Sequence, residues 1–188
     1  MIIQREDIPN LISILRILLT IPVVWMLLIR RFDIALVLFA IAGISDGLDG
    51  FLAKHFGWQS RLGGLLDPMA DKVLLVSSYV CLALLGLIPT LLMVLVIVRD
   101  LIIVTGALIY NFRIEELQAD PSLISKFNTF AQIVLVLAVV LDQGLIELPQ
   151  GSLQFLVWTV FFSTIASGVN YVWVWSRRAA GLGGGGKR

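Results

Sequence analysis

The strongest constraint on the fold is a set of six apolar stretches, each near the roughly 20 residues that an α-helix needs to cross a bilayer. Apolar residues make up 59% of the 188-residue chain and charged residues only 14%, with a mean hydropathy of +0.96. This composition excludes an ordinary soluble domain. We therefore predict an all-α integral membrane protein, a six-transmembrane-helix bundle whose spans are 11–29, 34–53, 62–88, 90–111, 123–141 and 153–175.

The segment before the first span has the pattern of a short N-terminal interfacial helix, because isoleucines flank the polar and charged residues 4–7. Pro9 and Asn10 are predicted to form the turn and cap that lead into the span. We expect one membrane domain, residues 1–180, followed by a flexible, basic, glycine-rich tail, residues 181–188.

Composition also excludes several classes of function. The formal net charge of +1 gives no field that would attract nucleic acid. A single cysteine, Cys81, cannot form an internal disulfide, and a single histidine, His55, does not supply a zinc site.

Basic residues outside the spans predict the orientation in the membrane. An even number of spans places both termini on one side, and nine basic residues fall there against two on the other. The nine are Arg5, Lys54, Arg61, Arg113, Lys126, Arg177, Arg178, Lys187 and Arg188, and the two are Arg30 and Arg31. The termini are therefore predicted to be cytoplasmic, and the expected location is the bacterial inner membrane.

Four aspartates inside two neighbouring spans indicate where chemistry takes place. Asp46 and Asp49 share one face of the second predicted helix, and Asp67 and Asp71 share one face of the third. Unpaired carboxylates at such a depth would repel one another and take up protons, whereas divalent cations would keep them ionised. Oxygen ligands suit magnesium, manganese or calcium, so the sequence predicts a metal site near the cytoplasmic boundary.

Glycines accompany these acids. Gly43 and Gly47 fit either close helix packing or the approach of a ligand, and both readings remain open. For Gly50 and Gly63, which adjoin the acidic pairs, we favour the approach of a ligand to the backbone.

The stretch from Asp46 to Asp71 resembles the signature of the CDP-alcohol phosphatidyltransferase family. That signature is D-x2-D-G-x2-A-R-x8-G-x3-D-x3-D, and seven of its eight fixed positions match. Lys54 stands where the family usually has arginine, which keeps the charge but removes the bidentate fork for a phosphate.

This resemblance implies a reaction and a set of site residues. The reaction transfers a phosphatidyl group from CDP-diacylglycerol to an alcohol and releases CMP. Two divalent ions, Mg²⁺ or Mn²⁺, would be held by Asp46, Asp49, Asp67 and Asp71, with Asp71 also acting as the catalytic base. The alternative role for any one of these aspartates is an ion pair with Lys72, Arg99 or Arg16. The expected residues for the CDP-linked lipid are Gly50, Ala53, Lys54, Arg61 and Gly63. A homodimer is also expected from the family. The active site is expected to face the cytoplasm, because cytidine nucleotides are cytoplasmic and the acidic pairs lie nearer the basic side.

The acceptor is predicted to be phosphatidylglycerol, with glycerol 3-phosphate as the alternative. The residue pair 99–100 and the stretch 124–129 resemble family members that form cardiolipin, whereas the opening residues 8–12 with Arg16 also resemble members that use glycerol 3-phosphate. Either acceptor carries a phosphate, for which the candidate cations are Arg16, Arg99 and Lys126. The alternative role for Arg99 is neutralisation by an acid such as Asp100.

Two other classes of membrane protein remain as weaker alternatives. A divalent-cation transporter would need ligands along a path through the membrane, but the outer half of each predicted span is almost entirely apolar. A polyprenyl transferase would need a second acidic motif in a later helix, and no predicted span contains one beyond residue 101.

Overall fold

The computed structural model describes the backbone of residues 7–56, 63–113 and 122–183, and the side chains of residues 11–48, 55, 69–105 and 122–173. These residues form six helices: α1 Asp7–Leu28, α2 Phe32–Phe56, α3 Gly63–Leu84, α4 Thr90–Arg113, α5 Leu123–Gly144 and α6 Ser152–Gly183. The predicted all-helical fold is confirmed. An α-helix satisfies its own backbone hydrogen bonds, which is why apolar stretches in lipid adopt it.

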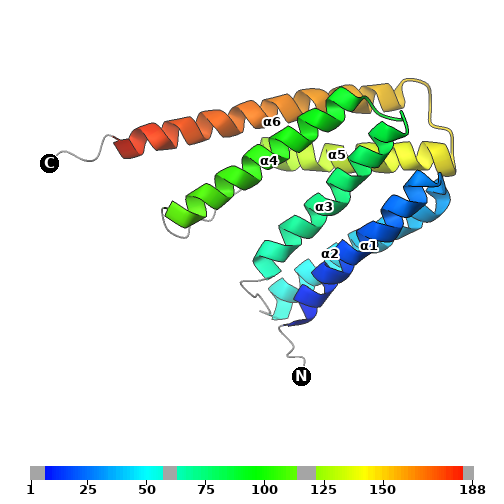
Figure 1. Cartoon of the computed structure of the whole chain (residues 1–188), viewed down its shortest axis with the longest axis horizontal. Helices are drawn as coiled ribbons and strands as arrows, with labels where there is room; N and C mark the ends of the chain where they lie inside the picture. Colours follow the sequence, from blue (N-terminus) through cyan, green and yellow to red (C-terminus); the bar gives the residue numbers. More distant parts are fainter. Residues whose placement is uncertain (1–6, 57–62, 114–121, 184–188) are drawn as a thin grey trace.

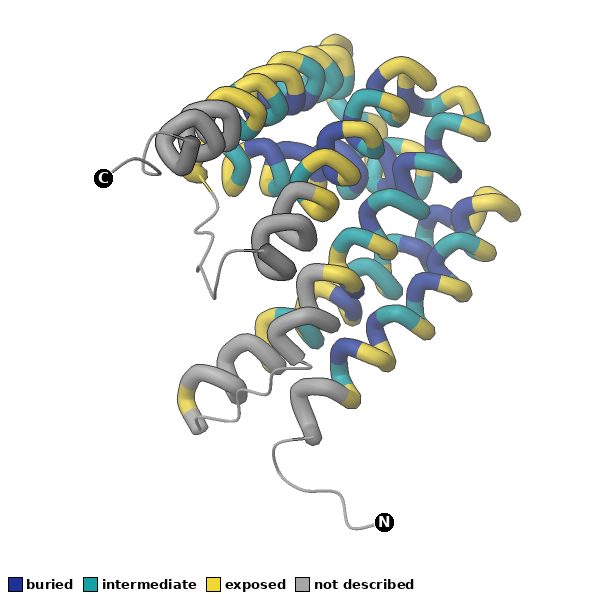
Figure 2. Tube along the Cα trace, turned by 60° about the vertical axis from the view of Figure 1, so that its left-hand side comes forward, coloured by how far each residue is buried: buried dark blue, intermediate teal, exposed yellow. Residues whose placement is uncertain are grey.

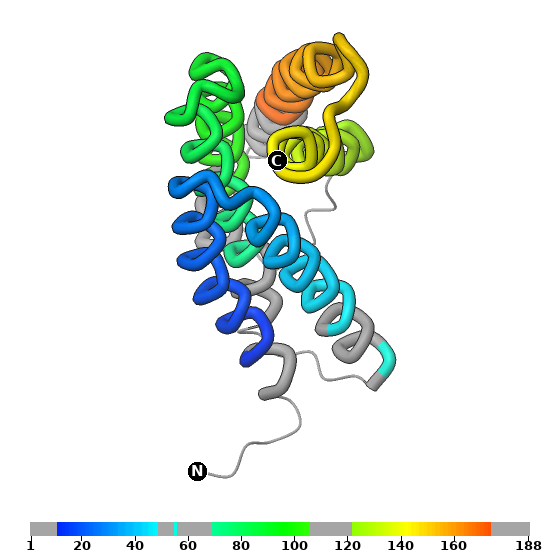
Figure 3. Tube along the Cα trace, turned by 90° about the vertical axis from the view of Figure 1, so that its right-hand side faces the viewer, coloured from blue at the N-terminus to red at the C-terminus, as the bar shows by residue number. Residues whose placement is uncertain are grey.

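The helices form two groups that meet along α3 and α5. Figure 1 shows α1, α2 and α3 side by side, and α1 contacts both α2 and α3. In the other group, α6 packs against α4 and α5. Contacts of α5 with α2 and α3, and of α3 with α4, join the two groups. Figure 3 shows the bundle from its side, with α5 and α6 crossing above α1 and α2.

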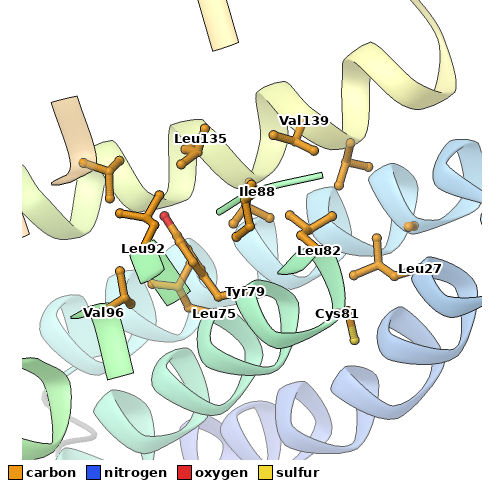
Figure 4. Packing of buried hydrophobic residues seen from close by; sticks show 14 of the residues in the cluster. Leu27, Leu75, Tyr79, Cys81, Leu82, Ile88, Leu92, Val96, Leu135 and Val139 are labelled. Carbon is orange, nitrogen blue, oxygen red and sulfur yellow. The ribbon is translucent and has the colours of Figure 1, made fainter. Parts of the chain in front are cut away.

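The core lies where these groups meet. Figure 4 shows Leu75, Tyr79 and Leu82 of α3 facing Leu135 and Val139 of α5. The Tyr79 hydroxyl is fully buried and donates a hydrogen bond to the carbonyl of Gln132 at 3.3 Å, which ties α3 to α5. A polar contact also joins α5 to α6, because the Asn128 side-chain oxygen accepts from the hydroxyls of Ser163 and Thr164.

The outer faces of the helices are apolar, as a lipid environment requires. Figure 2 shows exposed residues along the outside of each helix, and on α1 they include Leu15, Leu18, Ile21 and Trp25, all more than half exposed. A helix that is apolar on both its inner and outer faces is typical of a membrane span. Among the described residues, three segments are long and apolar enough to cross a membrane: Leu11–Leu28, Leu123–Gly144 and Ser152–Trp173. The chain is therefore an integral membrane protein, and the six predicted spans remain a prediction.

Helix ends follow the local sequence, with one difference from prediction at the start of α1. Ser122 caps α5 by accepting from the backbone N–H of Ser125, and the Pro89 carbonyl accepts the first bonds of α4. The turn predicted at Pro9 is wrong, because α1 begins at Asp7 and continues through that position. Proline is tolerated in the first turn, where the backbone N–H has no partner within the helix. Residues 1–6, which hold the rest of the predicted interfacial segment, lie outside the described residues.

The last helix extends past the predicted domain boundary. α6 has 32 residues and ends at Gly183, three residues beyond position 180, and Figure 1 shows its end extending past the other helices. At 1.5 Å per residue the helix is about 48 Å long, which exceeds the roughly 30 Å hydrocarbon core. Residues 184–188 lie outside the described residues.

Candidate active site

Two of the four predicted metal ligands meet at one arginine. Nη1 of Arg16 on α1 lies 2.6 Å from Oδ1 of Asp46 on α2, and the same nitrogen contacts Oδ1 of Asp71 on α3. The Arg16 side chain is 1% exposed, whereas those of Asp46 and Asp71 are 47% and 53% exposed. The prediction that carboxylates of α2 and α3 face each other is thus confirmed for this pair.

The packing of α1 explains why the three side chains converge. This helix contacts both α2 and α3, so a long side chain on its inner face reaches the acids of both neighbours. Arg16 lies on that face with Ser13, Thr20 and Val23, all of which are buried at a spacing of three or four residues. A cation buried in a membrane bundle is stable only when it is paired. The two carboxylates supply that pairing, so the ion pair with Arg16 that the sequence left open as an alternative is present for Asp46 and Asp71.

The other predicted ligands and the donor-binding residues cannot be placed by their side chains. Asp49 lies in α2 and Asp67 in α3, but both side chains are outside the described residues. The same holds for the five positions predicted to bind the CDP-linked lipid: Gly50, Ala53, Lys54, Arg61 and Gly63. Within the described part of the chain, no group of three or more acidic, histidine or cysteine side chains could hold a metal ion.

The described donors nevertheless fit a divalent metal. Asp46 and Asp71 bring carboxylate oxygens from two helices to one place, beside the Arg16 guanidinium. Both carboxylates keep about half of their surface exposed, so a metal ion could reach them. Carboxylate oxygens are hard ligands of the kind that Mg²⁺ and Mn²⁺ prefer.

A cavity of about 190 Å³ opens beside these acids. Its charged end is formed by Arg16, Asp46, Asp71 and Lys72. The rest of its wall is mainly apolar and comes from α2, α3 and α5: Phe39, Ala42, Gly43, Leu74, Leu75, Thr129, Ile133, Val136 and Leu137. Charged side chains beside an apolar wall suit the polar end of an amphipathic molecule such as a phospholipid, of which a cavity of this size holds only a part.

The structure clarifies the role of two glycines. A β-carbon added at Gly43 or Gly47 would meet no atom within 4 Å, so close packing within this chain does not require either glycine. Gly43 also lines the cavity. Of the two readings left open by the sequence, the structure therefore favours ligand approach over helix packing within the chain at Gly43.

A second cluster of charges joins α3 to α4. Nζ of Lys72 is 2.6 Å from Oδ2 of Asp100, and Nη1 of Arg99 is 2.7 Å from Oδ1 of the same carboxylate. Sequence reasoning missed the pair of Lys72 with Asp100. The position of Asp100 could have predicted such a partner, because an acid inside a predicted span and outside the four-aspartate motif needs a cation nearby.

The three cations predicted to bind the acceptor phosphate occupy different places. Arg16 lines the cavity, whereas neither Arg99 nor Lys126 does. Arg99 is 4% exposed and donates hydrogen bonds to Asp100, Ser125 and Ser167. Lys126 is exposed in the first turn of α5. The structure thus brings one of the three cations to the acidic site, and the acceptor role of all three remains a prediction.

Comparison with known proteins bears directly on this site. Residues 6–169 match the family described as CDP-alcohol phosphatidyltransferase. The chain is 36% identical to a human CMP-forming cardiolipin synthase over 181 residues, and 34% identical to the rat one over 180. Each alignment covers 87% of this chain and 60% of the relative.

A relative with a different acceptor is nearly as similar. A chloroplastic CDP-diacylglycerol–glycerol-3-phosphate 3-phosphatidyltransferase 1 from rice is 35% identical over 183 residues, which cover 88% of this chain and 56% of the relative. The chain thus spans about 60% of the length of the curated relatives it matches. The family match includes the aspartates of α2 and α3 and the helices that hold them, so this chain belongs to the CDP-alcohol phosphatidyltransferase family.

Proposed function

We propose that the chain is a CMP-forming cardiolipin synthase, which transfers a phosphatidyl group from CDP-diacylglycerol to phosphatidylglycerol. The observation that carries this proposal is the cavity whose charged end holds Asp46 and Asp71 and whose walls are apolar. Charged side chains beside an apolar wall suit a reaction at phospholipid headgroups, at the boundary of hydrocarbon and water. The similarity to the human and rat cardiolipin synthases supports the same acceptor.

The proposed metal site has two divalent ions, Mg²⁺ or Mn²⁺, held by Asp46, Asp49, Asp67 and Asp71. The family is generally dependent on divalent metals. When bound, the ions would offset the charge of the pyrophosphate and of the departing CMP. The chain's own contribution is to hold the carboxylates of α2 and α3 together through Arg16.

Asp71 is the proposed general base. It would take the proton from the acceptor hydroxyl while that oxygen bonds to the phosphorus of the phosphatidyl group. The bond from this phosphorus to the CMP oxygen breaks, and CMP leaves with the electron pair of that bond. Asp71 lines the cavity and its carboxylate is half exposed, so an acceptor in the cavity could reach it. The donor's cytidine and phosphates are assigned to Gly50, Ala53 and Gly63, which match the family signature, to Lys54, which stands at its arginine position, and to Arg61 nearby.

Phosphatidylglycerol is preferred to glycerol 3-phosphate on electrostatic grounds. A small, doubly charged acceptor needs several cations in its pocket. Of the three candidate cations, only Arg16 lines the cavity, and it already contacts two carboxylates. A singly charged phosphodiester with two acyl chains needs fewer cations and more apolar wall. The similarity to the rice protein keeps glycerol 3-phosphate as the second candidate.

The proposed arrangement in the membrane has six spans, with termini and active site on the cytoplasmic side. Cysteine introduced at His55 or Arg31, both exposed, tests it. His55→Cys should be labelled from the cytoplasm and Arg31→Cys from the opposite side, and the reverse pattern would contradict this orientation. A homodimer is the expected assembly, which the mass of the purified complex tests.

The function itself is tested by following CMP release. Purified protein supplied with CDP-diacylglycerol and phosphatidylglycerol should release CMP in the presence of Mg²⁺ or Mn²⁺. No CMP release with any alcohol acceptor, at any metal concentration, would contradict the proposed activity.

A further inference from the structure

We propose that Asp100 is a positioning residue that keeps the ammonium group of Lys72 away from the carboxylates of the metal site. This inference rests on the metal site of the proposed function. Lys72 directly follows Asp71 in α3, and both residues line the cavity. The lysine nitrogen, however, is buried and lies 2.6 Å from Oδ2 of Asp100 on α4.

Asp100 is itself held in place by a network that spans three helices. Its other oxygen accepts from Nη1 of Arg99 at 2.7 Å. Nε and Nη2 of Arg99 donate to the hydroxyl of Ser167 on α6 at 3.1 and 2.8 Å, and Nη2 also donates to Ser125 on α5. Both Arg99 and Asp100 are 4% exposed. A carboxylate fixed in this way provides a rigid partner for the flexible lysine side chain.

The position of Lys72 makes such a partner necessary. A lysine next to Asp71 has four flexible carbons and, without Asp100, would turn its charge toward the carboxylates that line the same cavity. Those carboxylates are Asp46 and Asp71, which Arg16 already contacts. In a site partly shielded from water, attraction between unlike charges is strong. The Lys72 ammonium would then be a second organic cation beside Asp46 and Asp71. It would offset the negative charge that Arg16 leaves on the two carboxylates, and it would compete with a divalent metal for their oxygens.

Asp100→Asn tests this inference through metal binding. Binding of Mn²⁺ to the purified full chain is followed by the electron paramagnetic resonance signal of the free ion. Loss of a residue that orients a metal site typically weakens metal binding by about 10- to 100-fold, and we expect a loss of this size for Asp100→Asn. The double variant Lys72→Gln/Asp100→Asn should regain the wild-type Mn²⁺ affinity, because the competing ammonium is gone.

A matched control separates positioning from general damage to α3. Ser78 is buried on the same helix, and its hydroxyl donates only to the backbone carbonyl of Leu74 at 2.7 Å. Ser78→Ala should bind Mn²⁺ like the wild type. If Asp100→Asn bound Mn²⁺ normally, or if the double variant were as weak as Asp100→Asn, the inference would be wrong.

Lys72→Gln alone keeps the inference testable if Asp100→Asn does not accumulate in the membrane. Asp100 retains Arg99 as its partner in this variant, so the fold should tolerate it. We expect the wild-type Mn²⁺ affinity, because the ammonium does not reach the metal ligands when Asp100 is present. A tenfold change in either direction would overturn the inference. A wild-type protein that binds no Mn²⁺ would instead contradict the proposed metal site.

Discussion

Arg16 and Asp46 form an ion pair in which Nη1 of the arginine lies 2.6 Å from Oδ1 of the aspartate. The same nitrogen contacts Asp71, so one guanidinium on α1 joins α2 to α3 at the charged end of the cavity. These contacts of Arg16 stabilise the packing of the three helices, and they place a positive charge where the proposed metal ions bind.

Arg16→Gln should therefore lower stability most when metal is absent. Breaking a fully buried ion pair costs about 3–5 kcal/mol, but both carboxylates are half exposed, so we expect about 1–2 kcal/mol in excess chelator. Mg²⁺ or Mn²⁺ should restore part of this loss, because a divalent ion replaces the missing positive charge. Unfolding of the purified protein, with and without metal, measures both effects.

The control for this change is Arg31→Gln. Arg31 and Asp33 form an exposed pair at 3.3 Å at the start of α2, and such pairs contribute little to stability. A hydrogen bond from Arg31 lowers the pKa of Asp33, whose side chain is 46% exposed. If Arg31→Gln destabilised the protein as much as Arg16→Gln, or if metal had no effect on Arg16→Gln, this account of Arg16 would be incorrect.

Asp46→Asn should abolish turnover, because it removes a proposed metal ligand without changing the size of the side chain. Chelation of the wild-type protein should have the same effect, and added Mg²⁺ or Mn²⁺ should restore activity to the wild type only. CMP release measures both. Full activity in excess chelator, or normal turnover by Asp46→Asn, would rule out the metal assignment.

Asp71→Asn should lower the turnover number by at least about 100-fold, the usual cost of losing a general base. Binding of CDP-diacylglycerol should be affected less than turnover, since proton transfer from the acceptor belongs to the chemical step. Binding titrations and single-turnover kinetics separate the two. Binding that falls in parallel with turnover would indicate that Asp71 acts mainly as a metal ligand.

The helices could be predicted from the sequence more completely than the site. Apolar stretches and breakers such as Pro89 set the helix ends to within a few residues, except at α6, which continues for eight residues beyond position 175. The turn at Pro9 was wrong because proline is compatible with a first helical turn as well as with a turn before it. Local sequence alone does not tell a proline within the first turn of a helix from a proline in a turn that precedes the helix.

The partners of the intramembrane cations were harder to predict. Spacing places Asp46 and Asp71 on helix faces that can meet, and the structure brings them together at Arg16. The choice of Asp100 as the partner of Lys72 depends on how α3 rotates against α4, and spacing along one helix does not determine that rotation. The burial of Arg99 depends in the same way on Ser125 and Ser167, which come from two later helices.

Gly144→Ala should destabilise the protein by about 1–3 kcal/mol, the usual cost of overpacking. A β-carbon at Gly144 would lie 2.9 Å from Cβ of Phe32 and 3.0 Å from the backbone nitrogen of Asp33, where the end of α5 meets the start of α2. Gly43→Ala is the matched control, because its β-carbon meets nothing within 4 Å and alanine favours a helix. Denaturation that shows equal stability for the two variants would contradict this packing.

The central claim is the transfer of a phosphatidyl group to phosphatidylglycerol, and the most direct measurement identifies the lipid product by mass. Purified protein is given CDP-diacylglycerol and Mg²⁺ or Mn²⁺ with either phosphatidylglycerol or glycerol 3-phosphate as the only acceptor. The account predicts cardiolipin and CMP with phosphatidylglycerol. Phosphatidylglycerophosphate from glycerol 3-phosphate, with no cardiolipin from phosphatidylglycerol, would contradict it.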